Sequence, residues 1–158
     1  MTISAWRFAK AKHADEAFSG EGARRFGGRW NNPGTPIVYA AGGISLALLE
    51  LLAHLEDAGI LPSYVLFRAE IKDNLIETLD EVSLPKDWRA APAPATVKAI
   101  GDTWYRQSRS AVLSVPSAIT PSERNYLVNP AHPDFRKIKV SGPLDYEFDP
   151  RILDLARG

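Results

Sequence analysis

Short apolar runs separated by glycine, proline and polar turns make up most of the chain. Runs of this length, rich in β-branched and aromatic residues, predict short β-strands. About six strands are expected among seven candidate segments, which are Ser4–Phe8, Ile37–Ala41, Tyr64–Ile71, Asn74–Leu79, Ala111–Val115, Lys137–Val140 and Leu144–Phe148.

Two longer segments have the spacing of helices. Ser45 can cap a helix that runs to about Asp57 and ends before Gly59. On a helical wheel its leucines share one face, and they are Leu48, Leu51, Leu52 and Leu55. Ala95–Ser108 is a second helix, although Gly101 lowers its helical propensity. The tail 150–158 is compatible with a short helical turn.

The order of these segments predicts the fold class. Strands and helices do not alternate regularly, which argues against a doubly wound parallel sheet and favours an α+β fold with mixed or antiparallel sheets and a few helices. A chain of 158 residues suits one domain. The proline-rich loop Leu84–Pro94 is too short and too apolar to be a domain linker.

Composition excludes several functions. The formal net charge is zero and the sequence pI is about 6.8, so no global basic field recruits nucleic acid or anionic lipid. Cysteine is absent, which excludes disulfides and thiolate chemistry. The N-terminus lacks the apolar core of a signal peptide, and the run Leu46–Leu55 is too short to span a bilayer. We expect a soluble, cytoplasmic protein.

The stretch from Gly20 to Glu50 carries the strongest local signal. Four glycines fall within nine residues, from Gly20 to Gly28. Arg24 and Arg25 lie among them, and Arg29 follows directly. Glycine permits close approach to the backbone, and guanidinium groups bind phosphate or carboxylate through forked hydrogen bonds. The loop is therefore a candidate anion site, with a solvated surface loop as the alternative. It matches neither the P-loop nor the dinucleotide-binding spacing.

Glu50 and His54 lie one turn apart on the polar side of the first helix, so their side chains can meet. A weak pair on a solvated helix face is the alternative. The chain has three histidines, at positions 13, 54 and 132, and lacks the H-E-x-x-H pattern. We therefore expect no metal site.

Two further side chains lie on expected strands. Arg7 lies between Trp6 and Phe8, so its guanidinium points to the opposite face if these rings face inward. An exposed charge on the sheet is the alternative. Tyr39 lies in the middle of a strand, where packing with a satisfied hydroxyl is the default.

Several separate motifs together resemble the RES-domain toxins, the toxin halves of RES–Xre toxin–antitoxin pairs. In order along the chain they are Arg7, Gly20–Ala23, Gly27–Asn31, Val38–Ala41, Ser45–Glu50, Val115–Ala118 and Asn129–Phe135. Each motif alone is weak, but their joint order is specific. The resemblance spans nearly the whole chain and implies one RES domain over residues 1–158.

The family is named after an arginine, a glutamate and a serine. The resemblance assigns the glutamate to Glu50 and the serine to Ser117, and it leaves Arg7 and Arg29 as candidates for the arginine. Tyr39 matches a family tyrosine. The motif that contains Asn129 and His132 also matches, without a clear role.

The resemblance implies an ADP-ribosyltransferase-like fold that uses NAD+ as substrate. Such toxins cleave the nicotinamide–ribose bond and pass ADP-ribose to water, phosphate or a protein. The implied partner is an Xre-type antitoxin that plugs the active site, and the complex, rather than the toxin alone, binds operator DNA. The zero net charge agrees with that division of labour.

The chemistry gives each residue a role. Glu50 would stabilise positive charge on the ribose, while Arg7 and Arg29 would bind the pyrophosphate. Tyr39 would stack on the nicotinamide, and Ser117 would hydrogen-bond the ribose or the amide. Ser117 is not expected to be a nucleophile, since no G-x-S-x-G motif surrounds it.

His54 would orient Glu50 or donate to a ribose hydroxyl, with a surface role equally open. Surface roles are expected for Arg24, Arg25, Asp57 and Glu123.

Three other functions stay open at this point. The first is selective mono-ADP-ribosylation of one cellular protein. The second is an inactive module that binds only an antitoxin or a nucleotide. The third is an RNA-cleaving toxin, for which the sequence offers no basic stripe interleaved with aromatic residues.

Overall fold

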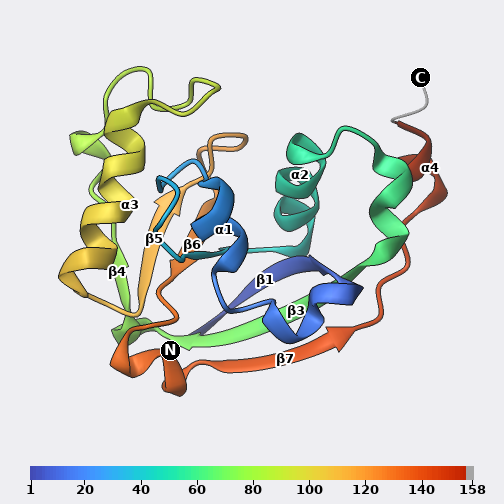
Figure 1. The fold of residues 1–158 in the computed structure, drawn as a ribbon, viewed down its shortest axis with the longest axis horizontal. Helices are drawn as coiled ribbons and strands as arrows, with labels where there is room; N and C mark the ends of the chain where they lie inside the picture. The colour runs from blue at the N-terminus through green and yellow to red at the C-terminus, as the bar shows by residue number, and fades with distance from the viewer. Residues whose placement is uncertain (156–158) are drawn as a thin grey trace.

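Seven strands form one curled sheet in the computed structural model of the protein, which describes residues 1–155 (Figure 1). The strand order is β4-β5-β6-β2-β1-β3-β7, in which β4 and β5 are parallel and every other pair is antiparallel. The strands are β1 Thr2–Lys10, β2 Val38–Ala41, β3 Tyr64–Lys72, β4 Ile76–Thr78, β5 Val112–Pro116, β6 Arg124–Val128 and β7 Lys139–Leu144. This arrangement confirms the expected α+β class.

The α-helices are α1 Glu21–Phe26, α2 Ile44–His54, α3 Ala95–Gln107 and α4 Pro150–Asp154. Short 3-10 helices cover Ala11–Glu16, Ala58–Ser63, Asp73–Leu75, Glu81–Ser83 and Pro133–Lys137. The expected helical turn in the tail is confirmed as α4, while residues 156–158 of that segment lie outside the described residues.

The sheet is weakly paired between β1 and β2. These two strands pair at a single registered position, Trp6 with Ala41, whereas β1 and β3 pair along all nine residues of β1. Beyond Trp6 the two strands separate. The sheet therefore has an opening in its middle, between β2 and β1.

Two helices cover separate parts of the core. Leucines of α2 pack with Phe8 and Leu66 of the central strands, so the predicted leucine face is confirmed. Val97 and Trp104 of α3 pack on Trp30. A Cβ atom at Gly101 would lie 1.9 Å from the carbonyl oxygen of Trp30, so glycine allows α3 to approach the loop that carries Trp30.

The bounds of α2 differ from the prediction. The helix begins after Gly43, and Ser45 lies inside it without a capping bond. It ends at His54, because Leu55 is already extended. Asp57 caps the following 3-10 helix instead, by accepting a hydrogen bond from the amide of Gly59 at 2.8 Å. The predicted end at Asp57 is therefore wrong.

Helix α1 and strand β6 were not expected from the sequence. Helix α1 forms despite the glycine content of its segment, because the side chain of Asn31 donates to the carbonyl of Ala23 and Gly34 donates to that of Arg24. Strand β6 lies in a segment that reads as a polar loop. It is stabilised by ladders to β5 on one side and β2 on the other.

One predicted strand does not form. The segment Leu144–Phe148 is not a strand, and only β7, Lys139–Leu144, pairs with β3. Phe148 is buried and packs with Phe8 instead, at a ring distance of 5.4 Å. Within residues 1–155, no helix has the length and apolar character to cross a membrane.

Candidate active site

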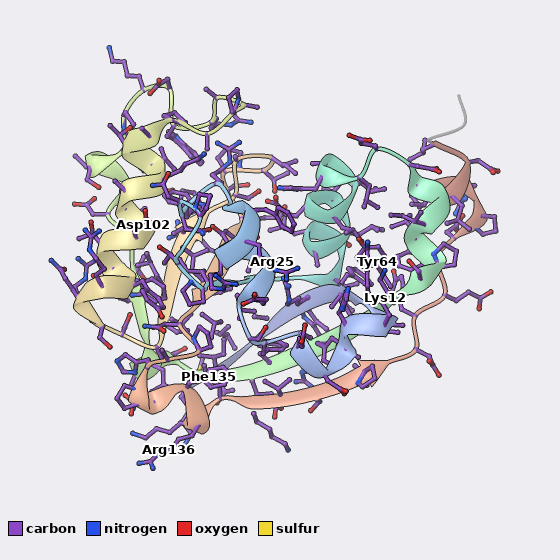
Figure 2. All side chains as sticks on the ribbon, in the orientation of Figure 1. Lys12, Arg25, Tyr64, Asp102, Phe135 and Arg136 are labelled. Atoms are coloured by element: carbon purple, nitrogen blue, oxygen red, sulfur yellow. The ribbon has the colours of Figure 1, made fainter. Side chains whose placement is uncertain are left out.

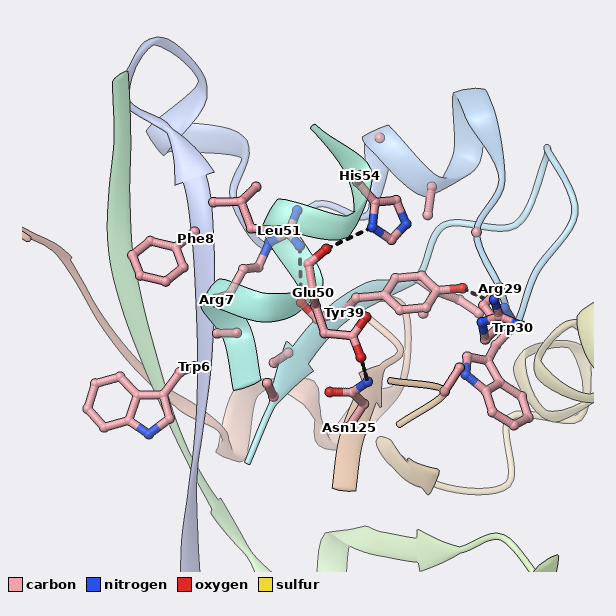
Figure 3. A pocket seen from close by; sticks show the side chains of 18 of the residues that line it. Trp6, Arg7, Phe8, Arg29, Trp30, Tyr39, Glu50, Leu51, His54 and Asn125 are labelled. Carbon is pink, nitrogen blue, oxygen red and sulfur yellow. Dashed lines mark hydrogen bonds between the residues drawn. The ribbon is translucent and has the colours of Figure 1, made fainter. Parts of the chain in front are cut away.

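A pocket of about 310 Å³ lies between α1 and α2, where β1 and β2 separate (Figure 3). Its wall includes Glu50 and His54 from α2, Arg7 from β1 and Tyr39 from β2. The glycine loop and the loop after β5 complete it, with Gly27, Gly28, Arg29, Trp30 and Ala118. The structure thus gathers most of the predicted site residues in one place.

The carboxylate of Glu50 is held on one side only. Its Oε1 atom accepts a hydrogen bond from Ser117 Oγ at 2.8 Å and another from Asn125 Nδ2 at 2.7 Å, of which Figure 3 shows the second. Its Oε2 atom has no hydrogen-bond partner among the described residues. One oxygen is therefore fixed, and the other is available to a ligand.

Ser117 is fully buried, and its hydroxyl group is fully engaged. The Oγ atom accepts hydrogen bonds from the amides of Ile119 at 3.1 Å and Thr120 at 3.2 Å, and it donates its proton to Glu50. A serine nucleophile would need a base to take this proton, and here the acceptor is the carboxylate that the serine orients. The geometry makes Ser117 a residue that positions Glu50.

Asn125 is a site residue that the sequence did not reveal. It lies on β6, and its amide nitrogen fixes Glu50 alongside Ser117. Its Oδ1 atom is buried and accepts no hydrogen bond within residues 1–155. The signal in the sequence was the run Tyr126–Val128, whose β-forming residues follow Asn125 directly.

Arg7 occupies the opening between β1 and β2. Its Nε donates to the carbonyl of Ala17 at 2.8 Å, and its Nη1 donates to the carbonyl of Tyr39 at 3.0 Å. The bond to Tyr39 takes the place of a backbone hydrogen bond between β1 and β2, which do not pair at this position. Trp6 and Phe8 pack in the core under α2, so the guanidinium lies on the other face of β1 (Figure 3).

Arg7 is an arginine without a counter-charge. No carboxylate pairs with it in the described part of the chain, and its Nη2 atom has no hydrogen-bond partner there. Burial lowers the pKa of Arg7, an effect that the nearby Tyr64 opposes. A charge that is desolvated in this way gains most from an anion that enters the pocket.

Tyr39 anchors the glycine loop through its hydroxyl group. The group donates to Asn31 Oδ1 and accepts a hydrogen bond from the amide of Trp30 at 3.1 Å. Burial raises the pKa of Tyr39 well above its usual value, because the phenolate would be desolvated. Only the ring of Tyr39 remains available to a ligand.

Asn31 is fully buried and ties this loop together, since its Nδ2 atom lies within hydrogen-bond distance of three carbonyl oxygens, those of Ala23, Asn32 and Thr35.

Arg29 sits at the tip of a tight turn. Gly28 and Asn31 form the β-bridge that closes this turn. A Cβ atom at Gly28 would lie 2.6 Å from the hydroxyl oxygen of Tyr39, so any larger residue would displace the turn or the ring of Tyr39. Arg29 Nη1 donates to the carbonyls of Trp88 and Ala90, at 3.0 and 2.9 Å. Its other nitrogens have no partner among the residues described.

The loop from Leu84 to Pro94 joins the two sides of the pocket. Arg29 binds its backbone from one side. From the loop itself, Arg89 Nε donates to the carbonyl of Ala118 at 2.8 Å, next to Ser117. Trp88 packs on Trp30 at a ring distance of 6.3 Å. The loop from Leu84 to Pro94 therefore connects the turn that carries Arg29 with the loop that carries Ser117.

His54 lines the pocket but does not bind the carboxylate of Glu50. Its Nδ1 atom lies 2.8 Å from the backbone carbonyl of Glu50 (Figure 3). A carbonyl oxygen only accepts hydrogen bonds, so Nδ1 carries a proton, and the tautomer of the neutral ring that fits this contact has Nε2 as its acceptor. The task of orienting Glu50 belongs to Ser117 and Asn125.

The remaining candidates lie outside the pocket. Arg24 and Arg25 are exposed and pair with Glu21. Asn129 and His132 close turns by accepting from the amides of Ala131 and Asp134, at 2.9 and 3.0 Å.

The segment that contains Asn129 and His132 leads directly to Phe135 and Arg136, which Figure 2 labels at the end of the sheet away from α1 and α2.

Among residues 1–155, no group of three or more His, Asp or Glu side chains could hold a metal ion.

Comparisons with known proteins agree with the motifs. The model of the RES domain matches residues 4–149. "Toxin Res" of Photorhabdus laumondii is 43% identical over 150 residues, which cover 94% of this chain and 96% of the relative. The "Prs ADP-ribosylating toxin" of Sphingobium sp. is 40% identical over 158 residues, with coverage of 97% and 98%.

A solved structure shares the fold. A chain of the M. tuberculosis MbcT–MbcA toxin–antitoxin complex superimposes with a TM-score of 0.74 at 22% identity, over 99% of this chain and 90% of the other. The family match covers nearly all of the strands and helices described above, along with every residue that lines the pocket. The chain belongs to the RES-domain family.

Proposed function

We propose that this protein is the toxin of a toxin–antitoxin pair and that it cleaves the nicotinamide–ribose bond of NAD+ in the pocket. One observation carries the proposal: the pocket holds a carboxylate and two arginines, and within residues 1–155 one oxygen of the carboxylate is free and no carboxylate pairs with either arginine. NAD+ offers the matching groups, a ribose that becomes positive during cleavage and a diphosphate.

The reaction breaks the bond between C1′ of the ribose and the ring nitrogen of nicotinamide. The bonding electrons move to the nitrogen, which neutralises the pyridinium, and positive charge develops on the ribose as in glycoside cleavage. The free Oε2 of Glu50 stabilises this charge and accepts a hydrogen bond from a ribose hydroxyl. An acceptor oxygen then bonds to C1′ and loses its proton.

Arg7 and Arg29 bind the diphosphate. Arg7 offers its Nη2, and Arg29 offers the nitrogens that do not bind Trp88 and Ala90. Both guanidinium groups are already fixed by backbone carbonyls, so little side-chain entropy is lost when the anion binds. The arginines thereby place C1′ of the ribose against Glu50.

The other residues complete the site. The ring of Tyr39 forms a flat wall for the nicotinamide, with its hydroxyl held away by Asn31. Ser117 and Asn125 keep Glu50 in place. In the neutral ring of His54, Nε2 accepts the proton of a ribose hydroxyl or of the acceptor.

The proposed partner is an antitoxin that covers the pocket. Support comes from the shared fold with a chain of the MbcT–MbcA toxin–antitoxin complex and from relatives that are named as toxins. From the family resemblance we expect an Xre-type antitoxin whose complex with this chain binds operator DNA. NAD+ in the cytoplasm would be the substrate.

Transfer of ADP-ribose to one protein is the second candidate function. It is favoured by the name of the Sphingobium relative, an ADP-ribosylating toxin that is 40% identical over 158 residues. The same bond is broken, and a side chain of the target replaces water or phosphate as the acceptor. A lysate incubated with labelled NAD+ distinguishes the two: one labelled band indicates protein transfer, and free ADP-ribose or its phosphate indicates NAD+ destruction.

Cellular NAD+ after induction tests the proposal directly, with Glu50→Gln as the matched control. Glutamine keeps an oxygen that accepts from Ser117 and Asn125 and replaces only the free oxygen by an amide. We expect NAD+ to collapse with the native chain and to stay constant with the variant. Equal NAD+ loss with both would refute the role of Glu50, and no NAD+ turnover with normal antitoxin binding would indicate an inactive binding module.

A further inference from the structure

Phe26, the last residue of α1, is exposed in a way that the fold does not explain. Its side chain is 82% exposed, and it belongs to none of the core clusters or ring contacts in the described part of the chain. It is the only aromatic residue among the large exposed apolar side chains there. An exposed phenylalanine contributes little to the stability of its helix, so it is a candidate for contact with a ligand.

Phe26 is not part of the pocket wall, but it shares a face of α1 with two residues that are. Gly22 and Ala23 line the pocket, and they precede Phe26 by four and three residues, which places all three on one face of the helix. A Cβ atom at Gly22 would meet nothing within 4 Å, so the space beside it is open. Gly22 and Ala23 thus form a flat shelf that ends at the ring of Phe26.

The pocket is too small for a whole dinucleotide. Its volume of about 310 Å³ lies at the lower end of the range of about 300–1,000 Å³ for pockets that enclose drug-sized ligands. If the nicotinamide ribose contacts Glu50 and the diphosphate contacts the arginines, the adenosine half must leave the pocket. The shelf along α1 is one side of the rim where it can do so.

We propose that Phe26 stacks on the adenine base of the dinucleotide, which makes it a specificity-determining residue of the site. The inference rests on the proposed function. A purine base has two apolar faces, and stacking on an aromatic ring is the interaction that recognises it. Gly22 has no side chain and that of Ala23 is a single methyl group, so both leave room for the flat base. In the proposed mode of binding, Arg7 and Arg29 hold the diphosphate that leads to it.

Phe26→Ala is the variant that tests this role. Removal of an exposed ring leaves the core unchanged, so the fold and kcat with NAD+ should stay constant. We expect KM for NAD+ to rise about tenfold, since stacking on one base is worth about that factor or more. The inhibition constant of AMP, which carries the base without nicotinamide, should rise by the same factor. Phe26→Trp, which keeps an aromatic ring at this position, should leave KM for NAD+ and the inhibition constant of AMP at their native values.

Two controls separate this role from others. Val82→Ala removes another exposed apolar side chain, 92% exposed and outside the pocket, and should change neither constant. Calorimetry with carba-NAD+, which has no cleavable glycosidic bond, should give weaker binding for Phe26→Ala by the same factor as the change in KM.

Each alternative outcome overturns a distinct claim. If the native chain neither cleaves NAD+ nor binds carba-NAD+, the proposed function fails and the inference falls with it. If the native chain is active and Phe26→Ala leaves KM and AMP inhibition unchanged, only the inference fails. Loss of antitoxin binding together with unchanged constants would likewise overturn it and would assign Phe26 to a protein interface.

Discussion

Ser117 donates its hydroxyl proton to Oε1 of Glu50 at 2.8 Å, across 67 positions of the chain. Ser117 donates its single proton to Glu50, and its oxygen accepts hydrogen bonds from two backbone amides, so the hydroxyl group has neither a proton nor a lone pair to spare for a ligand. We therefore propose that Ser117, which the resemblance assigns to the serine of the family name, acts through Glu50. It fixes one oxygen of Glu50 and leaves the other free.

Ser117→Ala should reduce activity without abolishing it. The variant removes one of two donors to Glu50 and leaves two buried amides without a side-chain acceptor, which costs about 1–3 kcal/mol of stability. We expect kcat to fall about 10- to 100-fold, because Asn125 still holds the carboxylate. Steady-state kinetics and urea unfolding measure both effects. A complete loss of activity in a folded variant, or a covalent adduct on Ser117 of the native chain detected by mass spectrometry, would instead indicate a nucleophile.

Arg7→Lys should weaken substrate binding more than catalysis. Lysine carries the charge but cannot bind the carbonyls of Ala17 and Tyr39 and an anion with a planar fork. We expect KM for NAD+ to rise at least tenfold, which corresponds to about 1.4 kcal/mol, with a smaller change in kcat. Arg68→Lys is the control, since Arg68 binds Ser4 outside the pocket. An equal effect of the two substitutions on KM would contradict this role.

Gly28→Ala should distort the turn that carries Arg29. The added methyl group would lie 2.6 Å from the hydroxyl oxygen of Tyr39, so the turn that carries Arg29 must shift. We expect a loss of about 1–3 kcal/mol of stability and a raised KM for NAD+. Gly43→Ala is the control, because its Cβ atom would meet nothing within 4 Å and its φ of −154° suits any residue. Thermal unfolding and kinetics of both variants decide the matter.

The raised pKa of Tyr39 predicts how the stability of the folded protein changes at alkaline pH. Its pKa is raised in the folded protein, while the unfolded chain ionises near the usual value of about 10. The folded state thus retains a proton that the unfolded state loses. The contribution to stability is complete below pH of about 10 and declines as pH rises toward the folded-state pKa.

The slope of this decline tests the assignment. A difference of one bound proton changes the free energy of unfolding by about 1.4 kcal/mol per pH unit. Above pH of about 10, the free energy of unfolding of Tyr39→Phe should therefore fall less steeply with pH than that of the native chain, and the two slopes should differ by up to this value. Urea unfolding at a series of pH values from 8 upward measures it. Identical slopes for the native chain and the variant would refute the shifted pKa.

The local pattern predicted most single elements but not the contacts between them. The leucine face of α2 and the strand at Tyr39 follow from periodicity, because burial of one face decides both. Strand β6 could not be predicted in this way: its residues are polar at the start, and its ladders to β5 and β2 supply the stability. Asn125 was missed for the same reason.

The candidate site shows a similar division. Glu50, Arg7, Arg29 and Tyr39 were found from motifs, and the structure brings them to one pocket. Which atoms remain free was not predictable, since it depends on long-range hydrogen bonds. His54 illustrates this, because helical spacing allows a contact with the carboxylate, but its ring binds the backbone carbonyl instead.

The place of β6 in the sheet also sets the order in which the site is completed during synthesis. Glu50 leaves the ribosome early, but Ser117 and Asn125, the two donors that fix it, belong to the last third of the chain. A nascent polypeptide that stops before residue 117 already carries Arg7, Arg29, Tyr39 and Glu50, yet its carboxylate is not held. A complete site therefore forms only after Asn125, 75 positions beyond Glu50, has been synthesised.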